Sequence, residues 1–112
     1  MEISPDSGSG STARIALTGR LDIQGAETVA LPLAALSGAK QNVVIDMSGV
    51  SFIASIGIRH LVSASKALTR RGGRLVLLNL TAPVREVLEM AGIIDMVSTA
   101  SSEEQVRALI GA

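Results

Sequence analysis

Short apolar runs alternate with helical patterns along most of the chain. Residues 43–45 and 75–78 are uninterrupted aliphatic runs, which are typical of strands buried on both faces. Between them, apolar positions recur at helical spacing and predict an amphipathic helix from Ile56 to about Arg70, with a core stripe formed by Ile58, Leu61, Val62, Ser65 and Leu68. Strands that alternate with helices indicate βαβ units and a largely parallel sheet.

The pattern predicts further elements on either side. Pro32 interrupts the helical pattern of residues 23–36 and is expected to bend or split that helix, because its ring removes a hydrogen bond and crowds the preceding turn. The other predicted elements are an edge strand within residues 1–4, a strand over 13–18 that ends at Gly19, strands over 42–46, 74–79 and 93–97, a helix over 82–90 capped by Thr81, and a last helix through Ile110 capped by Ser101 or Ser102.

These elements predict one α/β domain over residues 1–112. We expect a mostly parallel central sheet of about four or five strands with about four helices around it. The first two strands are the exception, since they are compatible with an antiparallel pair. Residues 5–12, rich in serine and glycine, are expected to form a flexible loop.

Charge and composition exclude several kinds of site. Ten basic and ten acidic side chains cancel, and Phe52 is the only aromatic residue, so we expect no direct nucleic-acid binding. The chain has no cysteine and a single histidine, His60, so neither a thiolate nor a histidine metal site is expected, and no cofactor. No apolar run approaches the roughly 18–20 residues that span a bilayer, and no signal segment begins the chain, which predicts a cytoplasmic protein without membrane insertion.

The motifs of common enzymes are absent from the sequence. There is no P-loop, no dinucleotide-binding glycine motif after a strand and no G-x-S-x-G elbow. His60 follows Ser55 by five residues and faces a different direction on a helix, so it is read as a solvated side chain beside Arg59. Asp22 and Asp46 both follow predicted strands, so their side chains could approach one another and form a carboxylate pair for acid/base chemistry. Capping and turn roles are much commoner for aspartate at such positions. The sequence therefore predicts a protein that is not an enzyme.

Residues 46–57 connect a buried strand to the amphipathic helix, and Ser55 stands where that helix begins. Two interpretations remain open for Ser55: a helix cap, or a hydroxyl presented at a helix N-terminus where a phosphoryl group is tolerated. Ile56 is expected on the side opposite the core stripe, together with Arg59, His60 and Ser63. An apolar residue ringed by polar ones suits a docking surface.

Residues 46–58, Asp-Met-Ser-Gly-Val-Ser-Phe-Ile-Ala-Ser-Ile-Gly-Ile, resemble the signature of STAS domains of the anti-sigma factor antagonist type. Residues 17–22, residues 71–77 and the region from Pro83 to Ile94 are similar to further segments of that family, in the same order. The resemblance implies a single STAS domain that binds an anti-sigma factor, a serine kinase with a histidine-kinase-like ATPase fold, and thereby releases a sigma factor. It also implies partner switching: the kinase phosphorylates the serine that corresponds to Ser55, which breaks the complex, and a serine phosphatase restores it.

The chain departs from the family pattern near this serine. Ala54 stands where an acidic residue is common, Ile56 replaces a second hydroxyl, and Arg20 replaces the acid of the G-E-L-D segment. The expected partner-binding surface includes two of these positions. Its residues are Arg20, Asp22, Ser55, Ile56, Arg59, His60 and Ser63.

Other functions remain open. STAS-like domains also belong to membrane transport and stress-sensing complexes without a phospho-switch, and the loss of the acid at Ala54 is compatible with that alternative. A third possible function is a sensor that binds a nucleotide, but the sequence has no glycine loop that would hold a phosphate.

Overall fold

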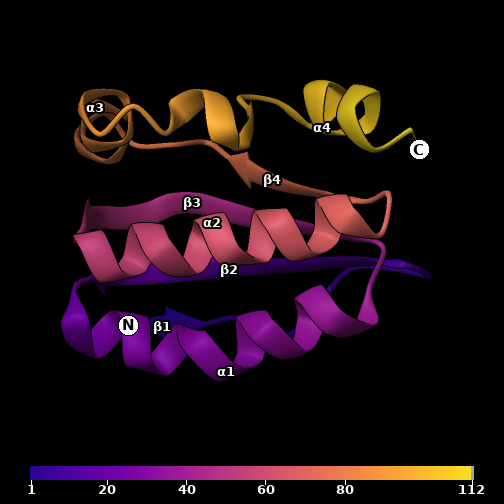
Figure 1. Ribbon diagram of the computed structural model, residues 1–112, viewed down its shortest axis with the longest axis horizontal. Helices are drawn as coiled ribbons and strands as arrows, with labels where there is room; N and C mark the ends of the chain where they lie inside the picture. Colours follow the sequence, from indigo (N-terminus) through magenta and orange to yellow (C-terminus); the bar gives the residue numbers. More distant parts are fainter. Residues whose placement is uncertain (112) are drawn as a thin grey trace.

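A five-stranded sheet forms the centre of the computed structural model, which describes residues 1–111 (Figure 1). The strands lie in the order β1-β2-β3-β4-β5. β1 (Glu2–Ile3) is antiparallel to β2 (Thr12–Leu21), whereas β3 (Asn42–Ile53), β4 (Arg74–Leu78) and β5 (Ser98–Ala100) continue the sheet in parallel. The expected α/β fold, its mostly parallel sheet and the antiparallel opening pair are therefore confirmed.

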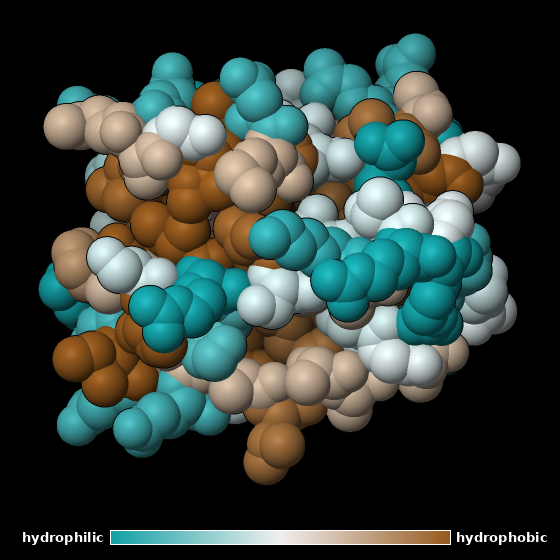
Figure 2. All heavy atoms as spheres, viewed as in Figure 1, coloured by the Kyte–Doolittle hydropathy of each residue, from teal (hydrophilic) through white to brown (hydrophobic). Residues whose placement is uncertain are grey.

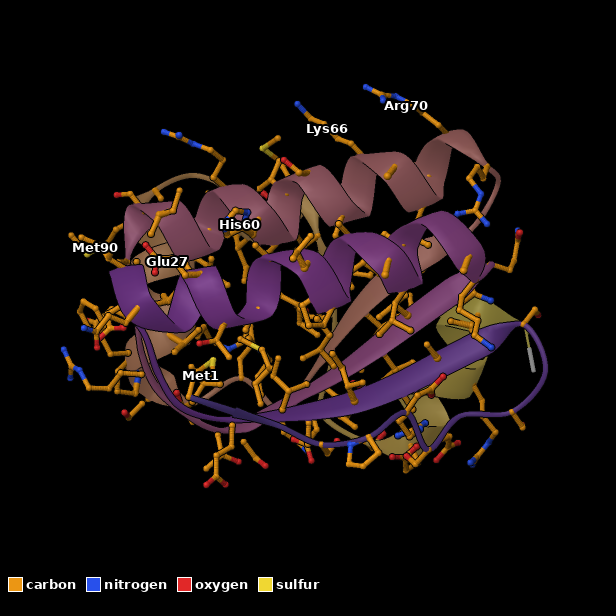
Figure 3. All side chains as sticks on the ribbon, turned by 90° about the horizontal axis from the view of Figure 1, so that it is seen from below. Met1, Glu27, His60, Lys66, Arg70 and Met90 are labelled. Atoms are coloured by element: carbon orange, nitrogen blue, oxygen red, sulfur yellow. The ribbon has the colours of Figure 1, made fainter. Side chains whose placement is uncertain are left out.

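Within residues 1–111, four helices cover the sheet. α1 (Ile23–Ala39) and α2 (Ser55–Arg70) lie side by side on one face, and α4 (Glu103–Ile110) packs on the opposite face against β4 and β5 (Figure 3). α3 (Ala82–Met90) packs against β3 near the end where α2 begins (Figure 1). The helices thus bury both faces of the central strands, as the aliphatic runs predicted.

The register explains how one apolar run serves two cores. Ile15, Ile45 and Leu77 are neighbours across three strands and belong to the large cluster under α1 and α2. Val44 and Val76 alternate with them, point to the other face and pack with Val106 of α4. Each of these residues is nearly or completely buried.

β2 and β3 are both longer than the sequence pattern predicts. β2 continues beyond Gly19 to Leu21, and β3 runs past Asp46 to Ile53, so the predicted ends at residues 18 and 46 are wrong. The extra residues pair with each other across two register shifts, and Gly19 has a φ of 120°. Such bulges accommodate glycine and small polar residues, which is why this part of the pattern resembled a loop.

Pro32 does not split the first helix. α1 is assigned as one helix from Ile23 to Ala39 with Pro32 inside it, so the expected break is wrong. The proline has no N–H to donate to the carbonyl of Thr28, but both residues are exposed and water can reach that carbonyl. The core side of α1, including Val29 and Leu33, remains buried on either side of the proline.

The predicted strand over residues 93–97 is also wrong. Ile94–Met96 forms a single 3₁₀ turn, and the strand follows it as Ser98–Ala100. Ile93, Ile94 and Val97 pack against the large core cluster from this turn, so their apolar character reflects burial rather than strand pairing. β4 also ends one residue earlier than expected, at Leu78.

Residues 5–11 lie between β1 and β2 and belong to no helix or strand. The Asp6 carboxylate accepts hydrogen bonds of 2.8 Å from the backbone N–H groups of Gly8 and Arg14, and the Ser7 N–H donates to the Arg14 carbonyl. Thr12 is already part of β2. The loop is therefore anchored to the start of that strand.

Candidate functional site

The carboxyl ends of β2 and β3 bring the starts of two helices together. Asp22 follows β2 and caps α1, with its Oδ1 accepting from the Gly25 N–H at 2.9 Å. Leu21 accepts a hydrogen bond of 2.9 Å from the N–H of Ala54, the residue that precedes α2. Both helix N-termini therefore point toward the same edge of the sheet, where open α/β folds place their functional groups.

Ser55 does not cap α2. The N-cap position belongs to Ala54, whose side chain makes no capping hydrogen bond, and Ser55 is the first residue of the helix. The Ser55 side chain is exposed, and its hydroxyl has no hydrogen-bond partner within residues 1–111. The helix-cap interpretation is therefore wrong, and the hydroxyl is free to meet another molecule.

The first turn of α2 contrasts with those of α1 and α4. The first backbone bond of this end runs from the Ile58 N–H to the Ala54 carbonyl, so the preceding N–H groups have no acceptor inside the helix. α1 and α4, in contrast, have side-chain caps from Asp22 and Ser102. α2 also has no acidic residue in its first turn, whereas α4 has Glu103 and Glu104. The beginning of α2 is thus left with positive dipole charge that no side chain offsets.

The outer residues of α2 divide into two rows rather than one face. Arg59, Lys66 and Arg70 are exposed, and Figure 3 shows Lys66 and Arg70 pointing away from α1. His60 is half-buried, lies between the two helices and lines a groove of about 220 Å³ with Ser63 and the small residues of both, Ala30, Ala34, Gly38, Ala64 and Ala67. The expectation that His60 is solvated beside Arg59 is therefore wrong.

Ile56 belongs to the row beside α1. It is half-buried, and it precedes Ser63 by seven residues, which places both on one side of the helix. Ile56 is thus less exposed than the pattern predicted, on the side of α2 that packs against α1.

Arg20 and Asp22 lie next to this helix start, on the last residues of β2 and the residue that follows. The Arg20 guanidinium carbon is 4.3 Å from the centroid of the Phe52 ring, and its Nε is 3.9 Å from Asp22 Oδ2. Phe52 is the Cα partner of Arg20 on β3 and comes three residues before Ser55. The structure therefore brings Arg20 and Asp22 to the same end of the sheet as Ser55.

Asp46 is not part of this group. It pairs with Ala16 in the middle of β3, and its Oδ1 accepts from the Ser48 N–H at 2.9 Å. Asp22 lies about six residues farther along the sheet, or roughly 20 Å at the rise of a strand. The suggested carboxylate pair is therefore wrong, and each aspartate has the local role that its sequence context favoured.

Two exposed apolar residues at this end were not predicted from the sequence. Ile23, the first residue of α1, is 69% exposed, and Met90, the last residue of α3, is 83% exposed. Figure 3 shows Met90 at the end of the molecule where α1 and α2 begin. The available signal was their place outside the core-facing positions of each helix, but only the fold shows that they lie at one end.

Within residues 1–111, no three side chains of the types that ligate metals form a group that could hold an ion. None of the helices in that part of the chain combines the length and apolar character needed to cross a membrane.

Comparisons with known proteins agree with this architecture. A family model described as the STAS domain matches residues 8–106. BtrV of Bordetella bronchiseptica, named as an anti-sigma factor antagonist, is 33% identical over 93 residues, which cover 82% of this chain and 80% of BtrV.

Solved structures show the same fold. SpoIIAA in its unphosphorylated form, described as an anti-sigma factor antagonist, superimposes with a TM-score of 0.81 at 24% identity, covering 99% of this chain and 98% of SpoIIAA. The phosphorylated form of SpoIIAA from Bacillus gives a TM-score of 0.73 at 23% identity and covers 96% and 98%. The Thermotoga maritima protein TM1081, named as an antagonist of the same type, gives 0.86 at 15% identity and covers 96% and 94%.

Proposed function

The chain belongs to the STAS domain family, and from this premise we propose that it is an anti-sigma factor antagonist whose binding is switched by phosphorylation of Ser55. The partner in this proposal is an anti-sigma factor with serine kinase activity, and a serine phosphatase reverses the modification. The name of BtrV supports the antagonist role, because this chain aligns with most of BtrV at 33% identity. The protein itself performs no catalytic step in this scheme.

The observation that carries the proposal is the free hydroxyl of Ser55. Ser55 is the first residue of α2, its side chain is exposed, and its hydroxyl takes no part in capping the helix. A kinase can therefore reach this hydroxyl without unfolding the helix. The existence of a phosphorylated form of SpoIIAA, a protein with the same fold, supports a modification of this kind.

The folded domain tolerates a phosphate at this position. The modification adds about 1.5 to 2 negative charges at neutral pH. At the first residue of a helix these charges meet unpaired N–H groups and the positive end of the dipole, which favour an anion. The fold is therefore expected to survive phosphorylation.

The complex, in contrast, is expected to dissociate. Apolar side chains that suit a docked partner lie at the same end of the molecule as Ser55: Ile56 follows it in the sequence, and Ile23 and Met90 are exposed there. A phosphate enclosed by such an interface loses its hydration. A hundredfold loss of affinity requires only about 2.8 kcal/mol, which an uncompensated interfacial charge can supply.

The test reconstitutes the purified protein with the anti-sigma factor kinase encoded in its genome and ATP, and maps phosphate by mass spectrometry. We expect modification of Ser55, no modification of Ser55→Ala, and normal modification of Ser9→Ala, which removes an exposed serine of the loop between β1 and β2. In titration calorimetry, Ser55→Asp should bind the kinase at least about tenfold more weakly than Ser9→Asp. Phosphate at another residue, or equal binding by the two aspartate variants, would contradict the proposal, and capture of a transporter component in place of a kinase would favour the alternative function.

A further inference from the structure

The charges of this neutral chain are strongly segregated along the sequence. Between Asp46 and Glu86 there is no acidic residue, although six of the ten basic side chains lie there: Arg59, Lys66, Arg70, Arg71, Arg74 and Arg85. α2 occupies the centre of this segment and contains three of the six. The positive charge of the chain is therefore concentrated on and around α2.

The three cations of α2 lie on one line. Lys66 and Arg70 follow Arg59 by seven and eleven residues, which places each within about 20° of Arg59 around the helix axis and spreads the three over roughly 16 Å. We call these three residues the basic stripe. Figure 2 shows hydrophilic side chains along α2 and apolar side chains between the first half of α2 and α3.

The basic stripe has no acidic partner within the protein. No carboxylate of residues 1–111 lies within 4.0 Å of Arg59, Lys66 or Arg70, whereas Arg14 and Arg20 both have one. Glu27 of α1 lies near the beginning of α2 in Figure 3 but does not reach ion-pair distance. The stripe is therefore a row of hydrated cations that face solvent.

Helix stability does not account for the stripe. Cations stabilise a helix near its C-terminus, which explains Arg70 and in part Lys66. Arg59 is the fifth residue of the helix, far from the C-terminal turn, so the helix dipole does not favour a cation at this position. Its position is more easily explained by an interaction with another molecule.

We infer that the basic stripe docks an acidic surface of the protein partner, alongside the contact at Ser55; this inference rests on the proposed function. Ser55 precedes Arg59 by one helical turn, so the stripe continues the proposed contact along α2. A flat anionic membrane would also approach Glu27 of α1 and Glu86 and Glu89 of α3, which repel it. A duplex nucleic acid would need a wider basic surface than three side chains. A narrow acidic ridge on a protein matches the stripe without meeting these carboxylates.

The stripe also gives the switch at Ser55 an electrostatic role. A phosphoserine at position 55 lies one turn from Arg59, at the spacing at which helical side chains form ion pairs. The phosphate, with about 1.5 to 2 negative charges, then more than offsets the single positive charge of Arg59 and repels an acidic partner. Release by phosphorylation is therefore expected to weaken as salt concentration rises.

The experiment uses the full chain, labelled with ¹⁵N, and a ten-residue polyglutamate peptide as the acidic probe. At low salt we expect amide shifts confined to α2, lost at about 0.3 M salt. Lys66→Glu/Arg70→Glu should weaken binding at least about tenfold, and Ser55→Asp should weaken it measurably. The matched control, Arg85→Glu/Arg107→Glu, makes the same charge change on α3 and α4 and should bind almost as the native chain does.

Two sets of results would overturn the inference. Shifts spread over the whole surface, or equal losses in the two double variants, would show that the peptide senses general charge only. Binding to phosphatidylserine vesicles or to a DNA duplex that depends on Lys66 and Arg70, under conditions where polyglutamate does not bind, would assign the stripe to a membrane or a nucleic acid. Neither result bears on whether the kinase modifies Ser55, so a failure of this inference can be told apart from a failure of the proposed function.

Discussion

Gly57 of α2 lies directly against Leu21 of β2: a Cβ added to Gly57 would be 2.7 Å from Leu21 Cγ and 3.1 Å from the Leu21 carbonyl oxygen. Leu21 is 1% exposed, and its carbonyl accepts the hydrogen bond from Ala54. The absence of a side chain at Gly57 therefore lets the first turn of α2 lie close to the end of β2. This contact determines where Ser55 is presented.

Gly57→Ala is expected to destabilise the protein by about 1–3 kcal/mol, because the buried Leu21 cannot move away without disturbing the core. Gly38→Ala provides the control, since a Cβ at Gly38 of α1 would meet nothing within 4 Å. That substitution should stabilise by about 0.5 kcal/mol through helix propensity. Urea unfolding measures both. Stabilisation by both alanines would contradict the close packing at Gly57.

Ser55→Ala is expected to change the free energy of unfolding by less than about 0.5 kcal/mol, because the Ser55 side chain makes no capping bond. Ser102→Ala, the same chemical change at a true cap, removes the bond that the Gln105 N–H donates at 3.2 Å and should cost about 1 kcal/mol. Thermal or urea unfolding compares the two variants. A larger loss at Ser55 than at Ser102 would restore the helix-cap interpretation.

Pro32→Ala is expected to raise the free energy of unfolding by about 2 kcal/mol. Proline costs about 3 kcal/mol relative to alanine inside a helix, and about 1 kcal/mol of this is offset by the lower entropy of an unfolded chain that contains proline. Leu31→Ala, at a neighbouring residue that is 82% exposed, should have little effect. A lower stability of Pro32→Ala would show that α1 depends on the proline.

The pKa of Asp6 is lowered below its ordinary value of 3.8, first by the hydrogen bond from the Arg14 N–H and then by that from the Gly8 N–H. A depressed folded-state pKa contributes stability that is present above pH 3.8 and is lost as the pH falls through the folded-state value. Carbon-13 NMR titration of the carboxyl group measures this pKa directly. We expect increased hydrogen exchange of the Arg14 amide in strong acid, corrected for intrinsic rates. Asp6→Asn, which keeps an acceptor but does not titrate, should remove that pH dependence, and an unshifted Asp6 would contradict the anchored loop.

The aliphatic runs and the apolar core stripe of α2 were sufficient to predict the sheet, its parallel strands and most helices. Burial requires apolar side chains at regular positions along the chain. The strands that contain Val44, Ile45 and Leu77 could therefore be predicted from their apolar runs. The sequence predicted where Thr81 lies but not what its hydroxyl binds. Thr81 does precede α3, but its hydroxyl donates to the Val50 carbonyl at 2.7 Å, so the predicted cap is wrong. Similarly, Ser102 proved to be the cap of α4, one of the two serines that the pattern allowed.

The sequence by itself determined the order of most strands and helices, the aliphatic residues that the central strands bury and that a helix begins at Ser55, since these follow from local patterns. Only the tertiary structure decided what surrounds Ser55. β3 extends to Ile53 because β2 is available as a partner, and that extension makes Ala54 the N-cap and frees the Ser55 hydroxyl. The packing of α1 against α2 separates His60 from Arg59 and leaves the basic stripe in solvent. Such outcomes depend on contacts between distant segments, which no local periodicity encodes.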